Sequence, residues 1–272
     1  MKVKREEVGK VIEKLRELGG KEEKAPEGVA ARFKFGRGVV QVYSTGSITF
    51  GGKERERLKE RVEKALADEV LKGRSFPIVG CDEAGKGELF GPLAVACIWA
   101  DREAYRELLK LGVKDSKKLK EEKIFELDEK IRKICHGKVR VLMPEEYNRL
   151  YGKFKNQNRL LEEIYLQILK ELVEKHGAKE IVIDKFSSKI GERVKGEFPE
   201  IEVVAVEKGE NEPVVAAAAV VAKAARLRGL KRLSEELGRE IREGNAENRE
   251  LLKAIPERER YRFVKEHFKV EE

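Results

Sequence analysis

The sequence predicts an α/β protein in which a mixed sheet flanked by helices follows a small α+β domain. Short apolar runs alternate with helical patterns from Pro77 onward, which is typical of a sheet covered by helices. Before that point, apolar and polar residues alternate over residues 31–50, as in half-buried strands, with a helical pattern on either side. We therefore expect a domain at 1–68, a linker at 69–76 and a larger domain at 77–272.

The first domain is predicted as a helix over 8–18, a charged loop over 21–28, a three-stranded meander and a charged helix over about 53–68. Alternation leaves one face of the meander polar. Its residues are Arg32, Lys34, Gln41, Tyr43, Ser47 and Thr49. Such a face suits a nucleic-acid backbone, and the same pattern equally fits an ordinary solvated face.

Charge points to a polyanionic partner. The chain has 59 Lys and Arg against 51 Asp and Glu, a net charge of +8. Residues 1–68 hold 17 of these cations and 12 of the anions, so most of the excess lies in the first quarter. A basic arm of this kind favours a role in holding nucleic acid. Charged residues make up 40% of the chain, which also resembles the composition of thermophile proteins.

The three cysteines, Cys81, Cys97 and Cys135, lie in apolar surroundings. We expect buried, reduced thiols in a cytoplasmic protein, because disulfides are rare in that compartment. A Cys81–Cys97 disulfide would require their two strands to pair. The sequence contains no stretch of about 20 apolar residues, so we expect no membrane span, and we expect no signal peptide.

The stretch 78–92 carries the strongest chemical signal. An apolar run ends in Asp82 and Glu83, and a glycine-rich loop containing Lys86 follows. Because neighbouring strand residues point to opposite faces, we expect the strand to end or bend between the two acids if they share a site. Paired carboxylates suit hard divalent cations, which prefer oxygen ligands. An acidic turn after a strand is the simpler interpretation of the same residues.

A third carboxylate, Asp184, ends the apolar run 181–183. Functional groups gather at the carboxyl ends of strands in α/β sheets, so Asp184 is a candidate for the same site. It could equally cap the helix that begins near Ser187. A strand over 201–206 then leads to three further acids, Glu207, Glu210 and Glu212, just before an Ala- and Val-rich helix.

Several motifs resemble the type 2 ribonucleases H. They are Asp-Glu-Ala-Gly-Lys-Gly-Glu at 82–88, Asp-Ser-Lys-Lys-Leu at 115–119 and the Ala-rich helix opening at 213–223. The Gly-Lys-Gly form is similar to ribonuclease HIII rather than to ribonuclease HII. Residues 42–52 likewise resemble the N-terminal domain of ribonuclease HIII, whose fold is similar to TATA-binding protein and which holds the substrate. The resemblance implies a ribonuclease H-like fold for the larger domain.

This resemblance also implies a set of catalytic and metal-binding carboxylates: Asp82, Glu83, Asp184 and Glu210. The spacer around Glu210 departs from the family pattern, so Glu207 and Glu212 remain alternatives for the fourth position. The implied cofactor is Mg²⁺, with Mn²⁺ as a possible substitute, bound as a pair of ions for phosphodiester hydrolysis.

The implied substrate is an RNA/DNA hybrid, whose RNA strand is cut to leave 5′-phosphate and 3′-hydroxyl ends. Main-chain amides of Gly85, Lys86 and Gly87 are implied to meet the 2′-hydroxyls, which distinguish RNA from DNA. Phosphate contacts are implied for Lys117 and Lys118, and substrate contacts for the face bearing Arg32, Lys34 and Tyr43. Asn156-Gln157-Asn158 resembles a further family segment and implies another substrate contact.

Other functional classes fit less well. Cleavage at single ribonucleotides in duplex DNA, as by ribonuclease HII, is the nearest alternative. A purely binding protein would gain nothing from four carboxylates that repel phosphate. A P-loop nucleotidase would need a Gly-x-x-x-x-Gly-Lys-Ser/Thr motif, which is absent. We expect a monomer.

Overall fold

The structure is a computed structural model that describes residues 1, 3, 5–113, 119–207, 209–245 and 248–268, except for the side chains of residues 210 and 249. The chain divides into two compact units, Met1–Gly73 and Arg74–Glu272. Each unit is described by itself.

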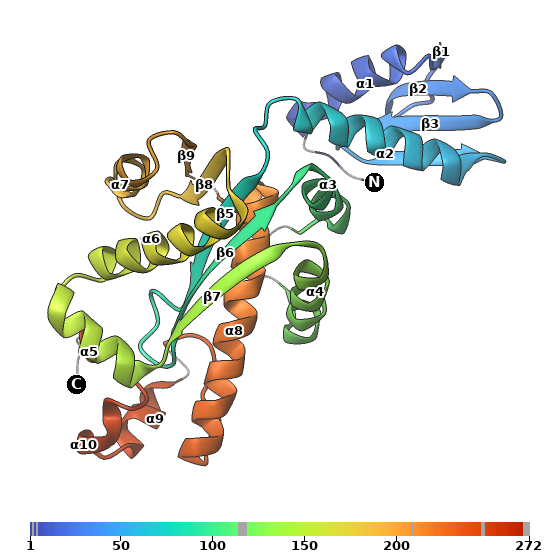
Figure 1. The fold of residues 1–272 in the computed structure, drawn as a ribbon. Coiled ribbons are helices and arrows are strands. Elements are labelled where there is room, and N and C mark those ends of the chain that lie inside the picture. Colours follow the sequence, from blue (N-terminus) through green and yellow to red (C-terminus); the bar gives the residue numbers. More distant parts are fainter. Residues whose placement is uncertain (2, 4, 114–118, 208, 246–247, 269–272) are drawn as a thin grey trace. The chain divides into compact units, whose positions relative to one another are not determined.

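The first unit is a four-stranded antiparallel sheet with two helices (Figure 1). Its elements are α1 (Val8–Glu17), β1 (Lys21–Glu23), β2 (Val29–Phe35), β3 (Gly38–Tyr43), β4 (Ile48–Gly52) and α2 (Arg55–Leu71). Alternate strand residues such as Phe33, Val40 and Val42 are fully buried and pack with Val11, Leu15 and Val62 of the helices. The α+β organisation expected for this part of the chain is therefore present.

One expectation for this unit was wrong: residues 21–28 are not entirely a loop. Lys21–Glu23 form β1, which pairs with β2 and places Glu23 opposite Arg32. The Glu23 carboxylate lies 3.1 Å from the Arg32 guanidinium and 4.0 Å from the Lys34 ammonium. Opposite charges facing each other across strands stabilise the pairing, so a segment without apolar residues can still join the sheet.

The expected linker at 69–76 is shorter in the structure. Helix α2 continues to Leu71, because that side chain is fully buried. Arg74 and Ser75 already belong to the second unit, where the Ser75 N–H donates to the Glu180 carboxylate at 2.9 Å.

The second unit is built on a five-stranded mixed sheet with the order β7-β6-β5-β8-β9. The strands are β5 (Ile78–Ala84), β6 (Leu93–Ala100), β7 (His136–Leu142), β8 (Glu180–Asp184) and β9 (Glu202–Val206). β5 and β6 pair antiparallel, as do β6 and β7. β8 runs parallel to both β5 and β9. This mixed sheet confirms the expected α/β class.

Helices cover both faces of this sheet. They are α3 (Arg102–Leu111), α4 (Glu121–Ile134), α5 (Pro144–Phe154), α6 (Gln157–His176), α7 (Ile190–Glu197), α8 (Pro213–Leu237), α9 (Arg249–Ala254) and α10 (Glu257–Arg260). Figure 1 shows α6 on one side of the sheet and α8 on the other, with α3 and α4 beside α8. Among the described residues, no helix has the apolar length needed to cross a bilayer.

A disulfide joins Cys81 of β5 to Cys97 of β6, so the expectation of reduced thiols was wrong for these two residues. The antiparallel register places them directly opposite each other, with their Cα atoms 4.1 Å apart. Both lie in the buried core between the sheet and α6. Cys135 is a buried free thiol, as expected.

Residues 263 and 264 pack beside the glycine-rich loop that follows β5. Phe90 of this loop pairs with Val264 and shares an apolar cluster with Phe263 and with Leu230 of α8. Segments far apart in the sequence therefore pack against this loop and stabilise it.

Candidate active site

Asp82 and Asp184 lie at the same level on neighbouring strands. β5 and β8 are parallel, and their register pairs Cys81 with Ile183, so the two aspartates follow at equivalent positions. Both side chains are half-buried. Asp184 therefore lies at the end of β8, as the sequence predicted, and Asp82 lies beside it on β5.

The expected end or bend between Asp82 and Glu83 does not occur. β5 continues to Ala84 in register with β6, and the glycine loop begins only afterwards. The Asp82 carboxylate turns along its own strand and accepts the Glu83 N–H at 2.8 Å. Asp82 and Glu83 are therefore consecutive residues of an unbroken strand, and the Asp82 carboxylate is held beside the backbone of Glu83.

Tyr165 of α6 completes this group. It is fully buried, and its hydroxyl donates a hydrogen bond to the Glu83 carboxylate. Burial raises the pKa of the Tyr165 hydroxyl well above its ordinary value, and the nearby Glu83, Asp82 and Asp184 carboxylates raise it further. The phenol therefore stays protonated and orients Glu83. Of the three carboxylates, Glu83 is the one that the Tyr165 hydroxyl contacts directly.

The segment after β9 approaches the same edge. The N–H of Gly209 donates to the Asp184 carboxylate at 3.1 Å. Gly209 opens a short 3-10 helix, Gly209–Asn211, so the backbone of residue 210 lies beside Asp184. The side chain of Glu210 is outside the described part of the structure, and its role stays a prediction.

The two alternatives to Glu210 point elsewhere. The Glu207 side chain is 84% exposed and lies 3.8 Å from the Lys185 ammonium. Glu212 is buried, accepts a hydrogen bond from the Tyr105 hydroxyl at 2.6 Å and pairs with Arg74. Because its carboxylate already neutralises a guanidinium, Glu212 is poorly suited to bind a cation.

The donor set fits a hard divalent cation. Asp82, Glu83 and Asp184 offer carboxylate oxygens, the ligands that Mg²⁺ and Mn²⁺ prefer. Within the described residues, no three His, Cys, Asp or Glu side chains already form a closed metal cluster. Mg²⁺ does not need one, because it binds through one or two carboxylates and keeps several waters.

The glycine loop lies next to these acids. Gly85 follows β5 directly, and the Lys86 ammonium stands 4.8 Å from the centre of the Phe186 ring, two residues after Asp184. A cation beside the carboxylates could meet a substrate phosphate. Lys117 and Lys118, the other predicted phosphate contacts, are outside the described residues.

The polar face of the first unit is also formed as predicted. Arg32, Gln41 and Thr49 lie in one row across β2, β3 and β4 and line a shallow hollow of about 260 Å³. Tyr43 is half-buried and Lys34 is exposed. The sequence pattern does not reveal that Arg32 and Lys34 share Glu23 as a partner, and this shared carboxylate reduces the positive charge of the face.

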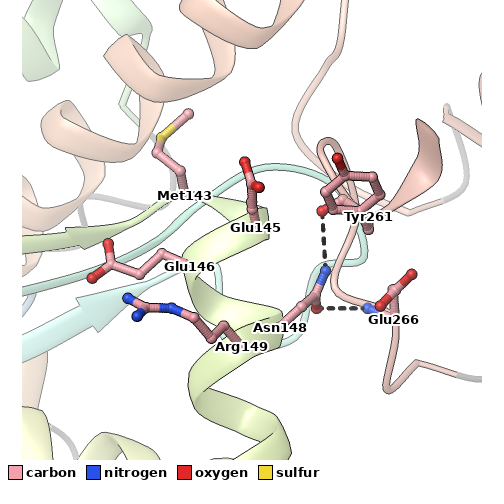
Figure 2. Close-up of a pocket in the computed structure, with 7 residues that line it drawn as sticks. All are labelled: Met143, Glu145, Glu146, Asn148, Arg149, Tyr261 and Glu266. Carbon is pink, nitrogen blue, oxygen red and sulfur yellow. Dashed lines mark hydrogen bonds between the residues drawn. The ribbon is translucent and has the colours of Figure 1, made fainter. Parts of the chain in front are cut away.

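A larger groove in the second unit is a different feature (Figure 2). It has a volume of about 780 Å³ and is lined by Met143, Glu145, Glu146, Asn148, Arg149, Tyr261 and Glu266. Three carboxylates against one guanidinium make it unfavourable for a polyanion. Asn148 instead ties down the C-terminal segment: it donates to the Tyr261 and Val264 carbonyls at 3.1 and 2.8 Å and accepts the Glu266 N–H at 3.0 Å.

Comparisons with known proteins agree with this geometry. The profile of the ribonuclease HII family matches residues 79–271. A ribonuclease HIII of Aquifex aeolicus is 32% identical over 239 residues, covering 86% of each chain. The crystal structure of Aquifex aeolicus RNase H3 is similar with a TM-score of 0.62 and 29% identity, covering 99% of both chains. Bst-RNase HIII in complex with Mn²⁺ gives a TM-score of 0.66 at 27% identity, covering 95% of this chain and 93% of that chain.

Proposed function

The chain belongs to the ribonuclease HII family and is a ribonuclease H, and from this premise we propose that it is an endonuclease that hydrolyses the RNA strand of RNA/DNA hybrids. The products are expected to carry 5′-phosphate and 3′-hydroxyl ends. The observation that supports this most directly is the common level of Asp82 and Asp184 on neighbouring strands, with Glu83 alongside. Like charges at one edge of a sheet repel each other unless a cation is bound, which supports a metal site here.

In this proposal Asp82, Glu83, Asp184 and Glu210 hold the divalent cations. When bound, Mg²⁺, or Mn²⁺ in its place, supplies the Lewis acidity for the two-metal-ion route to phosphodiester hydrolysis. Tyr165 keeps Glu83 oriented through its hydrogen bond. Lys86 contacts a phosphate near the scissile bond, and the amides of Gly85, Lys86 and Gly87 meet ribose hydroxyls. These contacts position the RNA strand over the carboxylates.

The first unit is proposed to hold the hybrid through the face that bears Arg32, Lys34 and Tyr43. Contacts to phosphate carry no sequence information, so such a module would raise affinity without restricting the sequence that is cut. Lys117 and Lys118 are proposed to add phosphate contacts within the second unit.

Cleavage at single ribonucleotides in duplex DNA is the second candidate activity. The family match includes ribonuclease HII, and the amides of the glycine loop would need only one 2′-hydroxyl to recognise. The Gly-Lys-Gly sequence and the additional N-terminal unit favour the hybrid as substrate.

The test is digestion of an end-labelled RNA/DNA hybrid beside a DNA duplex with one embedded ribonucleotide, each with Mg²⁺ or Mn²⁺. We expect wild-type protein to cut the hybrid in preference. Asp82→Asn and Glu210→Gln should abolish cleavage while hybrid binding persists. Glu207→Gln is the matched control, because this exposed carboxylate is neutralised in the same way without loss of a ligand. Full activity of Asp82→Asn would reject the metal scheme.

We also propose that the enzyme acts as a monomer in the cytoplasm. A disulfide is unusual there, but intracellular proteins of hyperthermophiles form an exception. The Cys81–Cys97 bond and the 40% content of charged residues together favour a thermophilic source.

A further inference from the structure

Every carbonyl from Lys86 to Phe90 is held by a group from another part of the second unit. The donors are Gln157 Nε2 to Lys86 O at 2.9 Å, Asn245 Nδ2 to Gly87 O at 3.0 Å, Lys265 Nζ to Glu88 O, Lys265 N to Leu89 O at 2.8 Å, and Arg226 Nη2 to Phe90 O at 3.2 Å. The loop therefore has one side that is bonded to the protein throughout, contributed by α6, α8 and two segments near the C-terminus.

This arrangement determines where the loop amides point. In a trans peptide, the carbonyl of one residue and the N–H of the next point in opposite directions. The peptide bonds of this loop are trans. Gln157 draws the Lys86 carbonyl toward α6, so the Gly87 N–H points away from α6. The Gln157 side chain thus sets the direction of the Gly87 amide.

Asn245 sets the direction of the Lys86 amide indirectly, through the neighbouring peptide groups of the turn. It draws the Gly87 carbonyl, which turns the Glu88 N–H inward, where it donates to the Gly85 carbonyl at 3.4 Å. Because the Gly85 carbonyl points into the turn, the Lys86 N–H, which belongs to the same peptide group, points out of the turn. Within the described residues, neither the Lys86 nor the Gly87 amide has a hydrogen-bond partner.

Both anchoring side chains make a second hydrogen bond that fixes their orientation. The second proton of the Gln157 amide goes to the buried Tyr147 hydroxyl at 2.9 Å. The Asn245 oxygen accepts the Leu89 N–H at 2.7 Å, so this side chain spans two positions of the loop. The turn that carries Asn245 is closed by Asn248, which donates to the Arg242 carbonyl at 2.7 Å. Such anchors leave little freedom to a loop whose glycines would otherwise move easily.

We propose that Gln157 and Asn245 are positioning residues that aim the Gly87 and Lys86 amides at ribose 2′-hydroxyls, and thereby set the preference for RNA over DNA. This inference rests on the proposed function, since it concerns how the same site recognises its substrate. A hydrogen bond weakens steeply as its angle departs from linear, so a tilted loop would lose recognition while its phosphate contacts persist.

The test uses full-length protein with isosteric variants. Gln157→Glu and Asn245→Asp keep the size of each side chain but remove the donor to the loop carbonyl. Gln167→Ala is the control, because Gln167 lies on the same helix as Gln157 but is exposed. In the Asp82→Asn background, the Kd is measured for an RNA/DNA hybrid and for a DNA duplex of the same sequence. Unfolding is followed in parallel to confirm that each variant is folded.

Each positioning variant should reduce the ratio of hybrid to DNA affinity by about 2- to 10-fold, the effect of one neutral hydrogen bond. The added negative charge should weaken binding of both duplexes equally. The ratio of hybrid to DNA affinity therefore reports only the change in the direction of the loop amides. In a hybrid that lacks the 2′-hydroxyls at the contacted riboses, variant and parent should bind alike. The Gln167→Ala ratio should not change.

Two results would overturn the inference: a ratio equal to that of the parent, or a variant effect that persists on the deoxy-substituted hybrid. Failure of the proposed function has a different signature. In that case the Asp82→Asn parent would itself show no preference for the hybrid, and the wild-type protein would not cleave it.

Discussion

Replacement of Gly85 by alanine tests the geometry of the glycine loop. Gly85 has a φ of +89°, in the region that L side chains rarely adopt. A Cβ built on it would lie 2.4 Å from the Arg226 Nε and 2.5 Å from the Pro92 carbonyl oxygen. Gly87, two residues along the same loop, has no atom within 4 Å of a built Cβ and serves as the matched control.

The expected cost follows from these two features. The left-handed backbone disfavours alanine by roughly 1–2 kcal/mol. Forcing a methyl group into a closely packed site typically adds about 1–3 kcal/mol. Arg226 cannot easily withdraw, because it is 1% exposed and its Nη2 is bonded to Glu88 at 2.8 Å. We therefore expect Gly85→Ala to destabilise the second unit by about 2–5 kcal/mol, and Gly87→Ala to change stability by at most about 0.5 kcal/mol.

The assay uses Trp99, the single tryptophan of the chain, which lies on β6 and so reports on the second unit alone. Denaturant unfolding followed by its fluorescence should give a lower midpoint for Gly85→Ala with an unchanged slope. Gly87→Ala should unfold like wild type yet cut the hybrid more slowly, because its methyl group would stand on the substrate side. A wild-type midpoint for Gly85→Ala would refute the close approach of Arg226 and Pro92 to this glycine.

Three further predictions concern other parts of the chain. Burial, with a smaller effect from Arg226, lowers the pKa of Lys265 to about 7 from 10.5, so the unfolded state binds more protons between these values. The unfolding free energy of wild type minus that of Lys265→Met should therefore rise with pH between about 7 and 10.5, by up to about 1.4 kcal/mol per pH unit. A difference that does not change with pH would contradict the burial of this ammonium group. Reduction of the Cys81–Cys97 disulfide, which spans 16 residues, should lower stability by about 3 kcal/mol, and thiol titration before reduction should find a single cysteine. Deletion of residues 1–73 should weaken hybrid binding and flatten its salt dependence; an unchanged salt slope would contradict a substrate-holding first unit.

The strands and the acids at their ends could be predicted because each signal is local. An apolar run followed by a carboxylate identifies both Asp82 and Asp184, and the rule that functional groups gather at the carboxyl ends of strands connects them. The strand Lys21–Glu23 could not be predicted in this way. It contains no apolar residue, and what holds it in the sheet is an ion pair with Arg32 that only the register of the strands makes visible.

The supporting residues of the site could not be predicted for a related reason. Tyr165 has the helical spacing of a core residue, and nothing in that pattern distinguishes a packed phenol from one that donates to Glu83. Gln157 and Asn245 meet the loop across 71 and 158 residues of sequence. Contacts of that kind depend on how whole elements pack, whereas periodicity reports only on neighbours along one element.

The site thus has two sets of supporting groups that act on different parts of it. The sheet register and Tyr165 hold the carboxylates, whereas Gln157 and Asn245 hold the loop. Because one set acts on the cation ligands and the other on the loop carbonyls, their functions should separate. Loss of a carboxylate should abolish turnover and leave the preference for RNA over DNA, since the loop amides stay in place. Loss of a loop anchor should reduce that preference and leave the chemistry on bound hybrid nearly intact, because the cation ligands do not move. An enzyme built this way can alter its substrate preference without rebuilding its metal site.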